Sequence, residues 1–516
     1  MSLAASRRAH DGWMRALLIV SIAAAVRLLF ATSIPVFPDE AYYWLWSRNL
    51  AAGYFDHPPV VALLIRLGGV LLAPIGLGAT GLAVRLGPIL AGWIAGIATA
   101  GMANRLGGSE AAVRASFIMA VMPLAAAGLV LATPDAGVLA ATAVTLYCLV
   151  RTLESDVGSR ESLRWWIATG LALGLAFTSK YTSIFLPIAV LIAVVVRGDL
   201  RVRLREAGPY VACVLAALVF LPVLLWNARH GWISFVFQIH HGLSAPQGSA
   251  LVAAWKHEGD FFGGQAALVS PILFVMMGIV VVRSFRATAP TACFALGVVA
   301  LVSFGFFVYS GVRQRVEANW PAPAYIPAIV LLSIASWTPR GEKWLRSGIG
   351  LGAVMSFLIY VQALIPILPL KPARDPIARA FGWTDLAAAV DSTAAVVRAE
   401  TNRRTWLGGD RYQEASELAF HSRGHPTTFS TNLSGRVNQF ELWAGFPLRA
   451  TGGDNLIMVV DDSDQPHAAI TALQPYFDEV RRGALVTLRR GRGEIATRRI
   501  WELREYHGGW PKRPTS

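Results

Sequence analysis

Long apolar runs separated by short polar segments dominate residues 1–370 of the chain. A helix needs about 20 mostly apolar residues to cross a hydrocarbon layer roughly 30 Å thick, because each residue rises about 1.5 Å. The pattern predicts eleven such helices, and 11–13 is the range we expect. Their predicted ranges are 14–34, 81–103, 112–131, 136–152, 165–179, 181–196, 208–226, 266–283, 288–310, 321–337 and 346–369.

Two apolar segments need a separate interpretation. The stretch 165–196 is long for one span and short for two, and Lys180 lies at its middle, so we expect a tight hairpin at 179–181. The segment 59–76 carries Arg66 and two glycines, which favours a helix at the membrane interface. The larger loops on the outer side are then 35–80 and 227–265.

The pattern changes after residue 370. Residues 371–516 are polar and contain no further apolar run of spanning length. Mixed periodicity predicts a strand that ends near Leu407, a helix over 409–420, a buried strand over 455–460 and a helix over 467–477. A terminal hairpin is expected to turn at 491–493. The fold class is therefore mainly α, a polytopic membrane domain over 1–370 followed by an extracytoplasmic α/β domain over 371–516.

Composition agrees with this division. The 516 residues are 54% apolar and only 15% charged, whereas soluble domains have about 25% charged residues. An ordinary cytosolic enzyme is therefore excluded. The net charge of +14 does not indicate nucleic acid, because the arginines are scattered between apolar blocks and form no continuous basic face. The three cysteines lie inside apolar runs and form no metal-binding spacing.

The distribution of basic residues predicts the orientation. If 59–76 is interfacial, seventeen Lys and Arg residues fall on the side of the N-terminus and seven on the other side. The positive-inside rule then places the N-terminus in the cytoplasm and the 371–516 domain outside. The first span has no A-x-A cleavage site, so we expect it to be retained.

The first outer loop contains an acidic pair. Pro38 suits the first position of a helix and places Asp39 and Glu40 in its first turn, where the helix dipole favours ionised carboxylates. Such a pair could take a proton from an acceptor hydroxyl or bind a divalent cation. Ordinary helix capping is the alternative explanation.

Other polar residues are expected on the same side. Asp135 lies at the outer end between two apolar runs, where helix capping is again the alternative to a functional role. Lys180 either belongs to a functional site or pairs with a structural partner, or its side chain extends to the membrane–water interface. The guanidinium groups of Arg313 and Arg315 could together bind a phosphate. The alternative is that both arginines lie in a solvent-exposed loop without a ligand. His257 is a candidate metal ligand.

No nucleotide-binding motif of the Walker or Rossmann type occurs in the sequence. The substrate must therefore arrive in another form, and a lipid-linked phosphate would suit a site at the outer leaflet.

Several motifs in order resemble one family. The acidic pair after the first span and the sequence Tyr-Phe-Asp-His-Pro-Pro at 54–59 resemble the first outer loop of the GT-C membrane glycosyltransferases, near the protein O-mannosyltransferases and the lipid A aminoarabinose transferase. Further similar stretches follow in the same order, at 83–88, 133–135, 174–182, 222–227, 317–323 and 412–420.

The resemblance implies transfer of a sugar from a polyprenyl phosphate carrier, with inversion, on the non-cytoplasmic side. It implies that Asp39 is the general base, that Glu40 supports it or touches the acceptor, and that Asp135 is a second acidic position near the cavity. Lys180, Arg313 and Arg315 become partners of the carrier phosphate. Tyr42, Asp56 and His57 belong to the first loop, and His57 replaces the lysine common in the aminoarabinose transferases.

The resemblance requires no cofactor, although some relatives bind a divalent metal, for which Asp56, His57 and His257 are the candidates. The expected partners are a polyprenyl-phosphate-linked sugar, an envelope glycan, lipid or protein as acceptor, and the lipid bilayer, with no nucleic acid. A glycolipid or polysaccharide acceptor is the leading hypothesis and a protein acceptor is its rival. A transporter or flippase of lipid-linked sugars is an alternative of another class, against which we see no internal repeat.

Overall fold

The computed structural model describes residues 3–511 apart from 244–249, 434 and 463–467. The chain divides into two compact units. The membrane unit comprises residues 1–32 and 51–364, and the C-terminal unit comprises residues 33–50 and 365–516. The predicted boundary at 370 lies close to the junction between residues 364 and 365. The grouping of 33–50 with the C-terminal unit was not expected.

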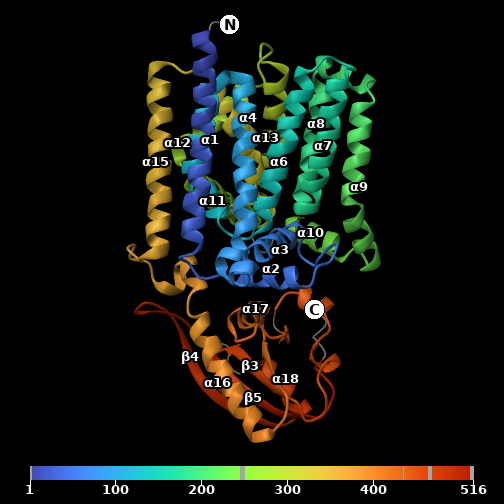
Figure 1. Ribbon diagram of the computed structural model, residues 1–516, viewed down its shortest axis with the longest axis vertical. Helices are drawn as coiled ribbons and strands as arrows, with labels where there is room; N and C mark the ends of the chain where they lie inside the picture. Colours follow the sequence, from blue (N-terminus) through green and yellow to red (C-terminus); the bar gives the residue numbers. More distant parts are fainter. Residues whose placement is uncertain (1–2, 244–249, 434, 463–467, 512–516) are drawn as a thin grey trace. The chain divides into compact units, whose positions relative to one another are not determined.

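The membrane unit consists of helices (Figure 1). The long helices α1, α4 and α15 run side by side in Figure 1. Apolar segments in a bilayer are helical because a helix satisfies every backbone hydrogen bond within the segment. The elements of this unit are α1 (Leu3–Ala31), α3 (Val60–Leu72), α4 (Gly81–Val121), α5 (Pro123–Gly128), α6 (Pro134–Glu154), α7 (Arg160–Ser179), α8 (Phe185–Val196), α9 (Gly208–Arg229), α10 (Ile233–Leu243), α11 (Ala250–Val269), α12 (Pro271–Arg283), α13 (Thr291–Arg313), α14 (Ala322–Ile334) and α15 (Pro339–Leu364).

Helices occupy all eleven predicted ranges, but fewer are long and apolar enough to span a bilayer. Among the described residues six helices meet that standard, or eight if each of two sharply bent pairs counts as one span. The predicted span 112–131 is wrong as a single helix, because Met122 is extended and separates α4 from α5. The predicted span 266–283 is also broken, by a 101° bend between α11 and α12.

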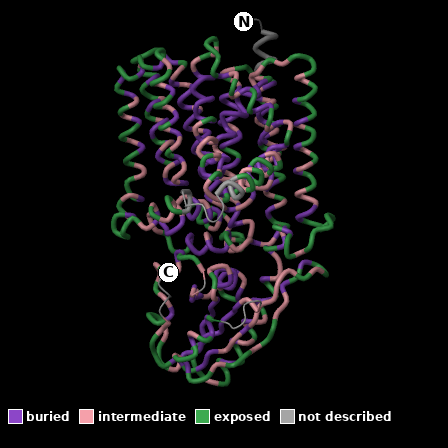
Figure 2. Tube along the Cα trace, turned by 180° about the vertical axis from the view of Figure 1, so that it is seen from behind, coloured by how far each residue is buried: buried purple, intermediate pink, exposed green. Residues whose placement is uncertain are grey.

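Burial separates central from peripheral helices in the membrane unit. In its most apolar stretch α6 is 78% buried, whereas α9 is only 22% buried and exposes leucine and valine side chains. Figure 2 shows the same contrast between buried and exposed positions along these helices. Exposed apolar side chains on peripheral helices are what a lipid solvent requires, because lipid tails are themselves apolar.

Glycines permit the closest helix contacts in this unit. A Cβ atom on Gly87 of α4 would lie 2.0 Å from the carbonyl oxygen of Leu64 in α3, and one on Gly68 would lie 2.1 Å from that of Ala83. These two glycines therefore let the backbones of α3 and α4 approach. The helix α3, with the 3₁₀ turn that follows it, is shorter than a bilayer-spanning helix, as expected for an interfacial segment.

The C-terminal unit is a small α/β domain, and the helix formed by residues 38–48 belongs to it. Its five-stranded sheet has the order β2-β1-β3-β5-β4, in which β2, β1 and β3 are parallel and the β4–β5 hairpin is antiparallel. The elements are α2 (Pro38–Arg48), α16 (Trp383–Thr401), β1 (Thr405–Gly409), α17 (Tyr412–His421), β2 (Thr428–Ser430), β3 (Asn455–Asp461), α18 (Ala468–Leu473), β4 (Phe477–Arg490) and β5 (Gly493–Tyr506).

Side chains alternate across the buried strand β3. Ile457 and Val459 join the core beneath α16, which lies along the sheet in Figure 1, and Leu456, Met458 and Val460 join the core on the opposite face. The expected strands at 407 and 455–460, the helix near 409–420 and the hairpin at 491–493 are confirmed. The helix α16 was not predicted.

Candidate functional site

The acidic pair lies at the start of α2 in the C-terminal unit. Pro38 is the first residue of the helix, and Asp39 follows it with an exposed side chain. The hydroxyl of Tyr412, the first residue of α17, donates to Oδ1 of Asp39 at 2.9 Å. The arrangement presents a carboxylate at a helix N-terminus with a phenol as hydrogen-bond donor, and such a carboxylate can accept a proton from a hydroxyl placed beside it.

Glu40 has a different environment from its neighbour. Its side chain is 1% exposed, and Oε2 accepts a hydrogen bond from the backbone N–H of Phe37 at 3.0 Å. This contact satisfies one of the amide groups that a helix start leaves without an intrahelical partner. The capping interpretation therefore describes this contact of Glu40, whereas its predicted role beside the base stays a prediction.

Tyr42 links α2 to the rest of the C-terminal unit. It is buried, its hydroxyl oxygen accepts from the N–H of Gln439 at 2.7 Å, and its ring centroid lies 4.6 Å from that of Tyr412. The ring of Phe440 is stacked with that of Tyr42, at a centroid distance of 6.2 Å. These contacts pack the ring of Tyr42 against that of Tyr412, whose hydroxyl reaches Asp39, and the predicted first-loop role of Tyr42 stays a prediction.

Asp135 and Lys180 meet inside the membrane unit. The Nζ atom of Lys180 lies 2.6 Å from Oδ1 of Asp135, and Nδ2 of Asn319 donates to Oδ2 at 2.5 Å. Asp135 and Lys180 are 7% and 8% exposed. Both oxygens of the carboxylate are therefore engaged by a cation and an amide. Asn319 belongs to the motif at 317–323, and its contact with Asp135 was not predicted from the sequence.

Local structure brings these three residues together. Asp135 lies in the first turn of α6, directly after Pro134. Lys180 lies between α7 and a 3₁₀ turn in an extended conformation, with φ −157° and ψ 134°, so the helical segment is interrupted where a tight hairpin at 179–181 was predicted. A Cβ atom on Gly137 would lie 3.1 Å from Oγ of Ser179, so the start of α6 and the end of α7 are in close contact.

The first loop of the membrane unit is held by the start of α10. The hydroxyl of Ser234 donates to the backbone oxygen of Tyr54 at 2.7 Å, and Nε2 of Gln238 donates to the backbone oxygen of Asp56 at 2.6 Å. Burial raises the pKa of Tyr54 to about 12, which a hydrogen bond from the N–H of Ala51 only partly opposes. The predicted residues Asp56 and His57 therefore lie in an ordered loop, and Asp56 is buried.

Other quoted motifs have structural roles. Arg85 is fully buried and donates to the backbone oxygen of Ala31 at 3.0 Å. The ring of Trp226 covers Gly53, where a Cβ atom would lie 2.7 Å from it. The buried Asn227 donates to the hydroxyl of Tyr181 at 3.3 Å.

Within the described part of the chain, no hydrogen bond or ion pair joins the remaining predicted residues Arg313, Arg315 and His257 to Asp135 or Lys180. Arg313 is the last residue of α13 and donates to the hydroxyl of Tyr309 at 3.2 Å. Arg315 is 75% exposed and lies 3.8 Å from a carboxylate oxygen of Glu317. His257 is half-buried on α11. Among the described residues no three His, Cys, Asp or Glu side chains gather as a group that could hold a metal ion.

The sequence is similar to that of known glycosyltransferases. Residues 56–226 match the family described as dolichyl-phosphate-mannose-protein mannosyltransferase. The chain is 27% identical over 353 residues to the lipid A galacturonosyltransferase RgtD of Rhizobium johnstonii. The aligned region covers 67% of this chain and 70% of RgtD.

The fold is similar to that of ArnT from Cupriavidus metallidurans. The crystal structure of that protein bound to undecaprenyl phosphate superposes with a TM-score of 0.64 at 16% identity, over 94% of this chain and 97% of ArnT. Its apo structure gives a TM-score of 0.62 at 17% identity, over 96% and 98% of the two chains.

The fold is thus that of a multi-pass membrane protein of the GT-C class, and the predicted fold class is confirmed. The chain is similar in sequence to glycosyltransferases of this kind over part of its length, and similar in fold to ArnT over nearly all of it.

Proposed function

We propose that this protein is an inverting glycosyltransferase that moves a sugar from a polyprenyl phosphate carrier to a glycolipid or polysaccharide of the bacterial cell envelope. In this proposal the N-terminus is cytoplasmic, and transfer takes place on the periplasmic side of the inner membrane. Support comes from the activity named for the relative RgtD, a lipid A galacturonosyltransferase, and from the undecaprenyl phosphate bound by the similar ArnT.

The observation that carries the proposal is the environment of Asp39. An inverting transfer needs a carboxylate that can reach the acceptor hydroxyl and take its proton as the new glycosidic bond forms. Asp39 is exposed at a helix start and accepts a hydrogen bond from Tyr412. Asp135, by contrast, is buried against Lys180. We therefore assign the base to Asp39.

The leaving group needs positive charge. The bond between the anomeric carbon and the phosphate oxygen breaks, and polyprenyl phosphate departs as an anion that requires no proton. An ammonium carries three N–H donors, and Lys180 directs one of them to Asp135. In the proposal Asp135 fixes the ammonium while its other protons, with Arg313 and Arg315, bind the carrier phosphate.

No cofactor is required in this proposal. If a divalent ion held by Asp56, His57 or His257 were essential, chelation would abolish transfer. We expect transfer in the presence of EDTA to equal that in its absence.

The acceptor has a second candidate. The matched family is described as a protein mannosyltransferase, and this match over residues 56–226 favours a protein acceptor as the alternative. Envelope lipid and envelope protein fractions, each offered with the same labelled donor, distinguish the two acceptor classes.

The test is transfer of labelled sugar from polyprenyl phosphate donors by the full-length protein in liposomes. Asp39→Asn should lower the rate at least about 100-fold, because general base catalysis contributes that much or more. The matched control is Asp385→Asn, which changes an exposed aspartate in the first turn of α16. Full transfer by Asp39→Asn would overturn the assignment of the base, and carrier translocation without any transfer would favour a flippase.

A further inference from the structure

The C-terminal unit contains a cavity of about 740 Å³ at the edge of its sheet. The strand β2 has only three residues and pairs with β1 from Leu407 onward, so it stops short of Thr405 and Trp406. The cavity occupies this open edge between α16, β1 and the segment 423–427. Its volume lies within the range of about 300–1,000 Å³ that is typical of small-molecule sites.

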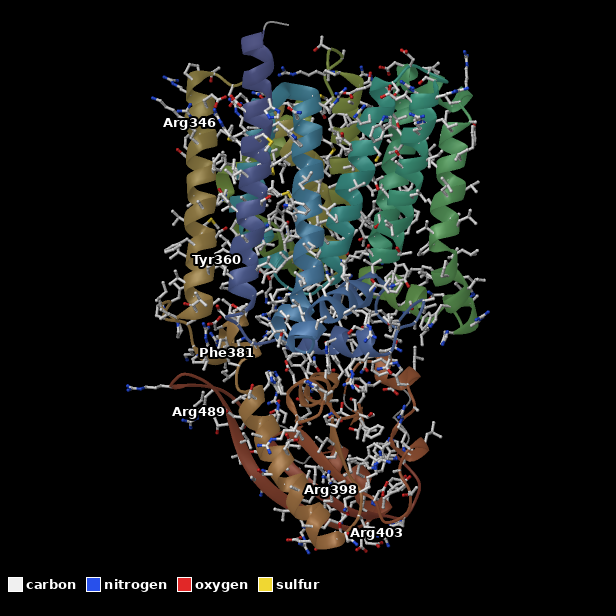
Figure 3. The ribbon with its side chains drawn as sticks, in the orientation of Figure 1. Arg346, Tyr360, Phe381, Arg398, Arg403 and Arg489 are labelled. Atoms are coloured by element: carbon white, nitrogen blue, oxygen red, sulfur yellow. The ribbon has the colours of Figure 1, made fainter. Side chains whose placement is uncertain are left out.

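Three arginines line this cavity. Arg398 comes from α16 and is labelled in Figure 3, Arg404 directly precedes β1, and Arg423 follows α17. All three are exposed, and within the described part of the chain none of their guanidinium groups forms an ion pair or a hydrogen bond. One acidic residue, Asp391, also lines the cavity, and it accepts a hydrogen bond from the backbone N–H of Arg423 at 2.9 Å.

Three largely buried arginines of the same unit each have an acidic partner. Arg490 pairs with Asp375 at 2.7 Å, Arg498 lies 3.2 Å from a carboxylate oxygen of Glu414, and Arg504 pairs with Glu400 at 2.7 Å. The cavity thus differs from its surroundings in holding three guanidinium groups against a single carboxylate. A concave surface with this excess of positive charge attracts anions.

Trp406 fixes the direction of one of these arginines. The guanidinium carbon of Arg404 lies 3.8 Å from the centroid of the Trp406 ring, whose Nε1 donates to Asp454 at 2.9 Å. Stacking on an aromatic face leaves the N–H groups of a guanidinium free to point outward in its own plane. Arg404 is therefore preorganised to donate two parallel hydrogen bonds to a planar or tetrahedral oxyanion.

We propose that this cavity binds a sugar that carries an oxyanion, either a phosphate or a carboxylate. The three arginines bind the oxyanion, and the hydroxyls of Thr405 and Thr427 at the same cavity are suited to sugar hydroxyls. The ligand is a free or lipid-linked acidic sugar. This site lies wholly within the C-terminal unit and does not depend on the transfer reaction.

The test measures binding by isothermal titration calorimetry to the full-length protein in nanodiscs at low salt. Glucose 1-phosphate and glucuronate are the two anionic probes, and glucose is the neutral one. We expect at least one anionic sugar to bind one site per chain and glucose not to bind. Binding of one anion alone identifies the oxyanion, whereas binding of neither, or equal binding of glucose, overturns the proposal.

Variants at exposed alanines of α16 locate the binding. Ala395 lines the cavity and Ala399 does not, and both side chains are exposed on the same helix. Because glutamate is a good helix former, Ala395→Glu should fold and place a carboxylate among the arginines. We expect it to weaken binding of the anionic sugar at least about tenfold, and Ala399→Glu to change it less than about twofold.

A third variant separates charge from bulk. Ala395→Gln adds the same volume without the charge and should weaken binding less than about threefold. Equal losses in Ala395→Glu and Ala395→Gln would overturn recognition by charge, and equal losses in Ala395→Glu and Ala399→Glu would overturn the location. The double variant Arg398→Gln/Arg423→Gln should lose binding as Ala395→Glu does, with unfolding temperature as the control for folding.

Discussion

Asp39 and Asp135 begin from the same local sequence. Each follows a proline in the first turn of a helix, α2 for Asp39 and α6 for Asp135. Asp39 is exposed and bonded to the hydroxyl of Tyr412, whereas Asp135 is buried and bonded to Lys180 and Asn319. Residues far away in the sequence determine this difference, and it separates a carboxylate that can exchange a proton from one that holds a cation.

The largest effect on stability is expected from the buried member of this comparison. Asp135→Asn leaves the ammonium of Lys180 without its charge partner, and breaking a buried pair costs about 3–5 kcal/mol. We expect a large fall in the midpoint of thermal unfolding. Glu494→Gln, which breaks an exposed pair with Arg489, should cost less than about 1 kcal/mol.

A double variant sharpens this prediction. In Asp135→Asn/Lys180→Met both charges are removed, so the stability lost in Asp135→Asn should largely return. If Asp39→Asn destabilised the protein as much as Asp135→Asn does, the contrast between the two carboxylates would fail.

Glu206 provides a second buried carboxylate, outside the proposed site. It accepts from Ser162 at 2.5 Å and pairs with Arg203 at 3.0 Å. Glu206→Gln should lower the free energy of unfolding by about 1–3 kcal/mol at pH 7 and leave transfer unchanged. Glu161→Gln, at an exposed pair with Arg151, is the control. A loss of transfer without loss of stability would contradict this structural role.

The same residue gives a pH dependence of stability. Burial alone raises the pKa of Glu206, but hydrogen bonds from Ser162 and Arg203 outweigh burial and hold the pKa below the ordinary value of 4.5. A carboxyl with a depressed folded pKa stabilises the protein above about pH 4.5 and loses that contribution as the pH falls. The difference in unfolding midpoint between wild type and Glu206→Gln should therefore narrow below pH 4.5.

Tyr412→Phe tests the contact made by the exposed carboxylate. The variant removes the hydroxyl that donates to Asp39 and keeps the ring that packs on Tyr42. A hydrogen bond to a charged group is worth about 1.5–3 kcal/mol, so kcat/KM for transfer should fall about 10- to 100-fold. Tyr476→Phe in the same unit should retain the wild-type rate, and an unchanged rate in Tyr412→Phe would separate Tyr412 from the reaction.

The smallest effect is expected at Arg315. Its side chain is 75% exposed, and its contact with Glu317 is 3.8 Å long, so Arg315→Gln should change stability by less than about 1 kcal/mol. If the guanidinium binds the carrier phosphate, the KM for the donor should rise several-fold at low salt and less at high salt. An unchanged KM at low salt would remove Arg315 from the donor site.

The helices of the membrane unit could be predicted because apolar runs must be helical in lipid. The extended Met122 and the bend before Pro271 could not, since both lie within apolar sequence and depend on packing with other helices. The strands at 405–409 and 455–461 were recognisable from apolar runs that end in polar residues.

The candidate site was predicted only as a set of residues. The Pro-Asp pairs at two helix starts made Asp39 and Asp135 candidates for the site. An aspartate at a helix start is equally typical of helix capping, so the pattern alone does not distinguish capping from catalysis. The contact between Asp135 and Lys180 joins residues 45 positions apart, and that between Tyr412 and Asp39 joins residues 373 apart. Pairings at such separations require the folded structure, because local sequence carries no information about them.

The grouping of α2 with the C-terminal unit has a consequence for synthesis of the chain. Translation at about 5–20 residues per second separates Asp39 from Tyr412 by roughly 20–75 s. Throughout that interval Tyr42 and Trp44, which are buried in the folded protein, lack the aromatic residues of α17 that pack on them, Tyr412 and Phe420. The packing of α2 is therefore completed only after residue 412 has been made, and a chain truncated before that residue cannot form it.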